Sequence, residues 1–98
     1  MTFRMKVYRV KGEVLVAVCD SDIVGRTFRE GELKIEVKES FYGEKEYSED
    51  EVKRELRRAT IANITGKKAV ELAIKIGIVD EDRVLEIGEC LHAQMVVM

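Results

Sequence analysis

Apolar and polar residues alternate at the start of the chain, and this pattern predicts a β-strand. Residues 3–7 place apolar side chains at every second position, which is typical of a strand with one buried face. Lys11-Gly12 then predicts a two-residue turn, because glycine readily adopts positive φ. Residues 14–19 are apolar at every position, as expected of a central strand covered on both faces. We expect these two strands to form a hairpin.

A third strand is predicted at residues 33–37, where apolar residues alternate with charged ones. One face of this strand should be exposed to solvent, and its lysines suit an edge strand. Between the hairpin and this strand, the polar residues 20–22 and Gly25 predict a short helical turn that the glycine ends.

Two helices are predicted in the second half of the chain. Ser48 followed by Glu51 forms a capping box, which marks a helix start and places carboxylates at its positive end. An apolar stripe at helical spacing continues this helix, and its members are Val52, Leu56, Ala59 and Ala62. After Gly66, a second and mostly apolar helix is expected over residues 67–76, and Gly77 ends it.

The last elements predicted are strands at residues 84–87 and 94–97. Together the elements predict an α+β fold. Its mostly antiparallel sheet would consist of the N-terminal hairpin, the third strand and a C-terminal hairpin, covered by two main helices. A chain of 98 residues has room for one core, so we expect residues 1–98 to form a single domain.

Composition points away from membranes and from export. Hydrophobic residues make up 46% of the chain and charged residues 37%. The longest apolar runs, residues 14–19 and 95–98, are far shorter than the ~20 residues needed to cross a bilayer. The N-terminus also lacks the apolar segment of a signal peptide, so we expect a cytoplasmic protein with free cysteines. The chain has no Pro or Trp and only one Asn and one Gln, and the scarcity of labile amides together with abundant Lys, Arg and Glu favours a thermophile.

The basic residues are concentrated in one part of the sequence, although the net charge is −2. Six of them form a candidate patch for an RNA backbone or another anion: Lys53, Arg54, Arg57, Arg58, Lys67 and Lys68. The alternative is a solvated helix face that pairs with the acidic residues before it. Arg26 and Phe28 lie in a loop where the ring can stack on an unpaired base, unless the core needs it.

Two cysteines and one histidine allow limited chemistry. Cys90 and His92 supply only two of the three or four ligands that zinc requires, so we expect no metal and no other cofactor. Cys19 and His92, with Asp20 as orienting group, would make a nucleophile pair if they met in the fold. The alternative is a buried Cys19 and a structural histidine. Gly66-Lys67-Lys68 lacks the residues of a phosphate-binding P-loop, but the following helix N-terminus can hold an anion.

Several short sequence segments resemble those of a family of archaeal proteins of roughly a hundred residues, known as a conserved domain of unknown function. These segments include Gly25-Arg26-Thr27-Phe28, residues 62–66 and His92-Ala93-Gln94. The resemblance runs nearly end to end and implies a cytoplasmic protein with a suspected role in translation. It supplies no catalytic residues. A site marked by these phrases would use Cys19, Asp20, Arg26, Phe28, Asn63, Gly66, His92 and Gln94.

Three functional hypotheses follow from the sequence. The first is a binding module that acts with RNA or ribosome-associated proteins. The second is an assembly subunit, because the apolar residues 95–98 can pair with another copy as a homo-oligomer. The third is a small enzyme or ligand-binding protein that uses Cys19, Asp20 and His92, and this hypothesis requires a cysteine thiol of lowered pKa.

Overall fold

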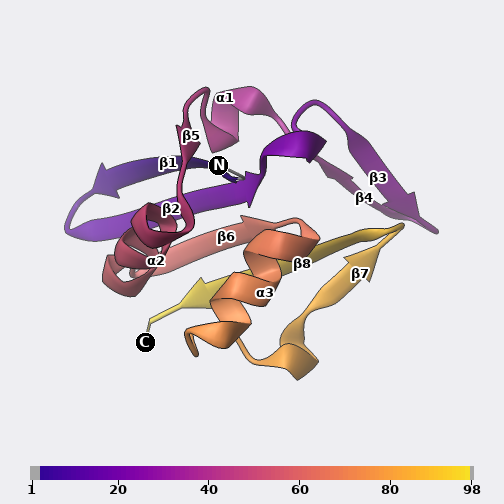
Figure 1. Cartoon of the computed structure of the whole chain (residues 1–98). Helices are drawn as coiled ribbons and strands as arrows, with labels where there is room; N and C mark the ends of the chain where they lie inside the picture. The colour runs from indigo at the N-terminus through magenta and orange to yellow at the C-terminus, as the bar shows by residue number, and fades with distance from the viewer. Residues whose placement is uncertain (1–2, 98) are drawn as a thin grey trace.

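A six-stranded sheet forms the centre of the computed structural model, which describes residues 3–97 (Figure 1). The strand order is β5-β1-β2-β6-β8-β7. The strands are β1 (Phe3–Val10), β2 (Glu13–Asp20), β5 (Glu46–Tyr47), β6 (Ile61–Thr65), β7 (Leu85–Ile87) and β8 (Cys90–Val96). Only β2 and β6 run parallel, and all the other neighbours are antiparallel. A separate hairpin consists of β3 (Thr27–Glu30) and β4 (Leu33–Glu36).

The helices are α1 (Glu39–Tyr42), α2 (Glu49–Arg58) and α3 (Lys67–Lys75), with short 3-10 turns at Ser21–Ile23 and Glu81–Arg83. The predicted capping box starts α2. The Glu51 N–H donates to Ser48 Oγ at 3.2 Å, and the Ser48 N–H donates to Glu51 Oε1 at 2.8 Å. The predicted α+β fold, the N-terminal hairpin and the second helix are all confirmed.

The two faces of the sheet are covered differently. Helices α2 and α3 cover one face, which we call the helix face, where fully buried apolar residues such as Val16, Leu56 and Ile64 form the larger core. Helix α1 and the β3–β4 hairpin cover part of the other face, which we call the open face (Figure 1). A smaller core lies beneath them and includes Cys19, Phe28 and Tyr42.

The prediction that the first helix continues to Ala62 is wrong. Helix α2 ends at Arg58, Ala59 has extended backbone angles, and residues 61–65 form β6. Ala62 lies beside Val16 in the parallel pairing of β6 with β2. The apolar spacing continued beyond the helix because Ala59 and Ala62 both contribute to the core of the helix face, one from a loop and one from a strand.

Two other strands differ from expectation. The predicted third strand, residues 33–37, pairs with β3 in the separate hairpin and is not an edge of the main sheet. The C-terminal strand begins at Cys90, earlier than predicted, and lies between β6 and β7. Met98, the last residue of the predicted apolar end, is outside the described residues. Within residues 3–97, no helix is long and apolar enough to cross a bilayer.

Candidate functional site

Strands β6 and β8 bring polar side chains together on the open face. Their antiparallel register places Asn63 opposite Gln94 and Thr65 opposite His92. Successive side chains of a strand point to opposite faces, so these four residues share one face while Ile64 packs into the core of the helix face. The alternation therefore concentrates the polar groups on the side of the sheet that α2 and α3 do not cover.

A chain of hydrogen bonds connects these residues through Tyr42 of α1. The Tyr42 hydroxyl donates to Asn63 Oδ1 at 2.6 Å and lies 2.8 Å from Thr65 Oγ1. Thr65 Oγ1 is 2.9 Å from His92 Nδ1, and His92 Nε2 is 3.3 Å from Gln94 Nε2. We call these five residues, Asn63, Tyr42, Thr65, His92 and Gln94, the polar chain.

One arrangement of protons satisfies the whole polar chain. Because the Tyr42 proton goes to Asn63, the Thr65 hydroxyl must donate to Tyr42. Thr65 can then accept only from His92 Nδ1–H, which leaves Nε2 to accept from the Gln94 amide. This pattern assigns His92 as the neutral tautomer protonated at Nδ1.

Burial keeps the two titratable members of the polar chain uncharged at neutral pH. It lowers the pKa of His92, which is only 8% exposed. Burial also raises the pKa of Tyr42 to about 12, although the hydrogen bond with Thr65 opposes this change. The polar chain is therefore a neutral array of hydrogen-bond donors and acceptors at neutral pH.

Three members of the polar chain, Tyr42, Asn63 and His92, line a cleft of about 460 Å³. Side chains from the sheet, from α1 and from the segment around β4 line this cleft: Asn63, Ile87, His92, Phe41, Tyr42, Lys34, Ile35, Glu36 and Lys38. The volume lies within the range of small-molecule sites. We call this space the open-face cleft.

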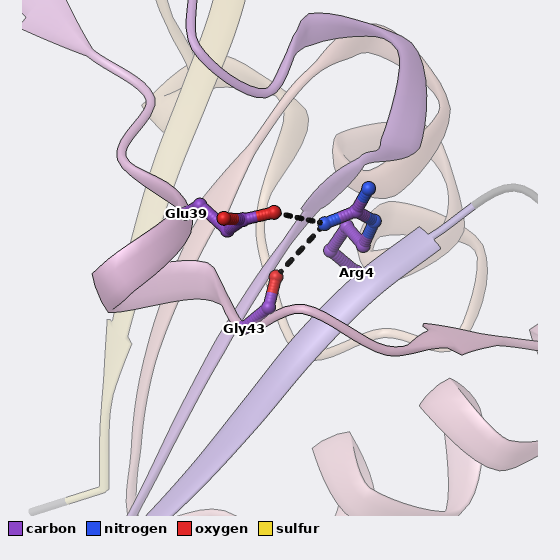
Figure 2. A network of polar contacts seen from close by, with 3 residues as sticks. All are labelled: Arg4, Glu39 and Gly43. Atoms are coloured by element: carbon purple, nitrogen blue, oxygen red, sulfur yellow. Dashed lines mark hydrogen bonds and ion pairs between the residues drawn. The ribbon is translucent and has the colours of Figure 1, made fainter.

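Helix α1 is fixed over the sheet by Arg4 of β1 (Figure 2). Arg4 Nη1 donates to Glu39 Oε2 at 3.2 Å and to the Gly43 carbonyl oxygen at 3.1 Å, so one side chain holds both ends of the helix. Gly43 has φ +97°, and a Cβ atom there would lie 2.8 Å from the Met5 carbonyl oxygen. This close approach to β1 positions Tyr42 above Thr65.

Asp20 occupies the N-terminus of α3. Its carboxylate accepts from the backbone N–H groups of Lys68 at 3.0 Å and Ala69 at 2.8 Å. Gly66 makes this possible, because a Cβ atom there would lie 2.5 Å from Asp20 Cγ. Burial raises the pKa of Asp20, and the two backbone donors oppose this change. The helix N-terminus that the sequence offers to an external anion is thus filled by the protein's own carboxylate.

Cys19 and Phe28 serve the smaller core. Cys19 is fully buried, and burial raises the pKa of its thiol to about 12. The enzyme hypothesis requires the opposite shift, so this thiol does not suit a nucleophile. Phe28 is 9% exposed, and the Arg26 guanidinium carbon lies 4.8 Å from its ring centroid. The ring is therefore covered and not free to stack on a base.

The six basic residues of the candidate patch divide into two groups. Strand β6 separates the end of α2 from the start of α3, and its five residues span roughly 16 Å. Lys53 pairs with Glu49 at 3.2 Å, and Arg58 pairs loosely with Glu55 at 3.9 Å. The exposed residues are Arg54, Arg57, Arg58, Lys67 and Lys68. The first three lie on α2 and the other two at the start of α3.

Of the eight predicted site residues, Asn63, His92 and Gln94 meet in the polar chain, while Asp20 and Gly66 meet at the start of α3. Sequence reasoning missed Tyr42 and Thr65. Thr65 follows Asn63 by two positions, so recognising β6 as a strand would have placed both on one face. Within residues 3–97, no three His, Cys, Asp or Glu side chains lie in an arrangement that could hold a metal ion.

Comparison with known proteins agrees with the resemblance seen in the sequence. The family model described as "Protein of unknown function (DUF424)" matches residues 8–98. A crystal structure of an uncharacterised conserved protein from Methanopyrus kandleri is similar, with a TM-score of 0.82 and 23% sequence identity. The match covers 97% of this chain and 90% of that chain, and at this identity it establishes the fold alone. No curated protein matches the sequence.

Proposed function

The chain belongs to the DUF424 family, and we propose that it acts as a non-catalytic binding module that captures a nucleotide in the open-face cleft. The observation that carries this proposal is the polar chain, a set of neutral donors and acceptors fixed on a rigid sheet and open to a cleft. Buried polar groups are costly in an otherwise apolar core, so a complete network on one face favours a role in recognition.

Asn63 and Gln94 are suited to the edge of a planar base: Asn63 lines the open-face cleft, and Gln94 is exposed on the same face beside it, outside the cleft lining. They lie directly opposite each other, and the neighbouring hydrogen bonds from Gly66 to Leu91 and from Val97 to Thr60 make theirs a non-hydrogen-bonded pair with close side chains. Among the hydrogen bonds within residues 3–97, none uses Asn63 Nδ2. Gln94 donates through its nitrogen and keeps its oxygen as an acceptor. A free donor beside a free acceptor matches the hydrogen-bonding edge of a nucleobase.

Lys34 and Lys38 are suited to a phosphate at the rim of the cleft. Both are exposed and line the cleft, and Lys38 directly precedes α1. Within residues 3–97, neither lysine forms an ion pair. Glu36 lies between them in sequence and also lines the cleft, so the net charge of these three residues is positive by one unit. If these lysines bind the phosphate of a nucleotide, its base can reach the polar chain.

The test is calorimetric titration of the whole chain with AMP, GMP, CMP and UMP, followed by short single-stranded RNA. We expect Asn63→Ala to weaken binding about tenfold, which corresponds to about 1.4 kcal/mol. Lys34→Glu with Lys38→Glu should weaken it further and remove its salt dependence. The matched control is Arg54→Glu with Arg57→Glu on α2, which should leave binding unchanged.

The two sources of a nucleotide are distinguished in the same experiment. Saturable binding of a mononucleotide indicates a free small molecule, whereas binding only of the oligonucleotide indicates an unpaired residue of RNA. The proposal fails if neither ligand binds, or if Asn63→Ala binds as well as the unchanged protein.

A second candidate function is the docking of an RNA backbone on α2. The observation that favours it is the exposure of Arg54, Arg57 and Arg58, of which only Arg58 has an acidic partner within residues 3–97. This function predicts RNA affinity that falls steeply with salt. Arg54→Glu with Arg57→Glu would then abolish binding, and Asn63→Ala would not affect it, so one variant set separates the two functions.

A further inference from the structure

Strand β8 has an open edge over its second half. Strand β7 has three residues and pairs only with residues 90–92 of β8. Figure 1 shows β7 beside β8 near one end and diverging from it toward the other. Strand β6 borders the other side of β8 as far as Val96. Within residues 3–97, no strand lies beside residues 93–96 on the β7 side.

The hydrogen-bond pattern shows which backbone groups this edge presents. The Val97 N–H donates to the Thr60 carbonyl oxygen, and the Gly66 N–H donates to the Leu91 carbonyl oxygen, both at 2.8 Å. The backbone N–H and C=O groups of residues 91, 93, 95 and 97 therefore point toward β6. Gln94 and Val96 point their N–H and C=O groups outward, because the direction alternates along an antiparallel strand.

This edge lacks the features that usually prevent strands from pairing. Residues 93–97 contain no charged residue and no proline, and Val96 and Val97 are 59% and 61% exposed. The other edge strand, β5, is two residues long, and exposed Glu86 lies in β7. A depression of about 230 Å³ lies on the helix side of the same segment. Apolar residues such as Ile78, Met95 and Val97 make up most of its lining, and the charged residue Arg57 also lines it.

We propose that this edge is a homodimer interface in which β8 of one copy pairs antiparallel with β8 of a second copy. The partner is a second copy because the edge is complementary to itself. In a register centred on Met95, Gln94 of one copy lies opposite Val96 of the other, and both residues present outward N–H and C=O groups that satisfy each other. The absence of charge at residues 93–97 also avoids like-charge repulsion across the twofold axis.

The side chains agree with this register. Met95 falls on the axis as a non-hydrogen-bonded pair with its own copy, where side chains approach most closely. Met95 is partly buried, and it points to the helix face beside the 230 Å³ depression, which can receive the second copy's Met95. The interface joins two six-stranded sheets into one continuous sheet. It places Val96 of the second copy beside Gln94 on the open face, outside the residues that line the open-face cleft, and it does not depend on nucleotide binding.

Two variants of the whole chain test the interface. Light scattering coupled to size exclusion, over a range of protein concentrations, should show a dimer that dissociates on dilution. Val96→Lys should shift the protein to monomer at every concentration, because it places a charge on each side of the twofold axis. Val10→Lys, at a position 61% exposed in the β1–β2 hairpin, is the matched control and should leave the dimer intact.

Met95→Cys gives a second and independent result. Opposite residues of a non-hydrogen-bonded pair have Cα atoms roughly 4.5 Å apart, which a disulfide can span. We expect oxidation to link two Met95→Cys chains covalently, whereas Val10→Cys should not link, and the native cysteines are buried. A monomer at all concentrations overturns the proposal. So does a dimer that Val96→Lys leaves intact and Met95→Cys does not link.

Discussion

The two faces of the central sheet differ in what fills them. On the helix face, α2 and α3 cover the larger apolar core, whose centre includes fully buried residues such as Val16, Leu56 and Val70. On the open face, α1 and the β3–β4 hairpin cover a smaller core and leave a cleft into which the polar chain opens. The strands contribute to both faces, so neighbouring residues of one strand serve different purposes.

Because side chains alternate between the two faces along each strand, stability depends mainly on the helix face and the proposed recognition on the open face. Apolar packing on the helix face supplies most of the free energy of folding, since it buries the larger core. That leaves the open face free to hold a hydrogen-bonded network, which contributes less to stability but presents fixed donors and acceptors. Ile64 and Thr65 are adjacent in β6 and belong to opposite faces.

The largest expected effect comes from the helix face. Ile64→Ala removes a fully buried side chain and should lower the free energy of unfolding by roughly 2–5 kcal/mol. Urea unfolding followed by circular dichroism measures this. Nucleotide affinity of the folded variant should not change, because Ile64 points away from the open-face cleft. A loss of affinity in folded protein would show that the two faces are not independent.

Thr65→Val should produce a smaller loss of stability and a larger loss of binding. The change keeps the shape of the side chain but removes the hydroxyl between Tyr42 and His92, leaving both without that partner. We expect a cost of roughly 1–3 kcal/mol in unfolding and weaker nucleotide binding, because Asn63 and His92 lose their fixed orientation. The paired comparison with Ile64→Ala is the control. Binding equal to that of the unchanged protein would remove the polar chain from recognition.

Asp20→Asn tests the contact between the end of the central strand β2 and the N-terminus of α3. The amide keeps one acceptor oxygen but places N–H groups near the N–H donors of Lys68 and Ala69. We expect a loss of about 1 kcal/mol, as for a helix cap, with nucleotide binding unchanged. Thermal unfolding measures the change. An equal or greater stability would mean that the burial cost of the Asp20 carboxylate exceeds the value of its two hydrogen bonds.

The smallest effect is the pH dependence from His92. Its pKa is lower in the folded protein than the usual 6.5, so the unfolded chain binds more protons in this range and stability falls as pH drops through about 6.5. Asp20 acts in the opposite direction, because its raised pKa adds stability as it becomes protonated. The difference between the unchanged protein and His92→Asn isolates the histidine. Parallel stability curves for the two proteins at pH 5 to 8 would contradict the lowered pKa.

Elements with a clear local signal were accessible from the sequence, whereas the short elements β3, β5 and α1 were not predicted. The capping box at Ser48, the alternation at residues 3–7 and the glycines that end helices act over a few residues, so their pattern predicts structure without knowledge of distant contacts. The same local reasoning misassigned Ala62. Two short apolar residues at helical spacing carry no information about the parallel pairing with β2 that makes residues 61–65 a strand.

The candidate site also shows what local sequence reasoning can and cannot predict. Asn63, His92 and Gln94 could be selected from the sequence as polar residues at element ends, but nothing local indicated that they meet. Their convergence depends on the register of β6 with β8, and on Arg4 and Gly43 holding Tyr42 over the sheet. Likewise, Asp20 and Gly66 are adjacent only because β2 and β6 run side by side.

The sequence alone predicts the α+β class and the elements that begin or end at local signals, such as the N-terminal hairpin, α3 and the start of α2, because hydrophobic period, caps and turns are properties of short segments. Only the tertiary structure decided which faces the polar residues share, which helix end is already capped and which strand edge stays open. Those features arise from pairings between segments far apart in the chain. The register of each pairing decides which side chains lie on which face of the sheet and which backbone groups point toward the neighbouring strand.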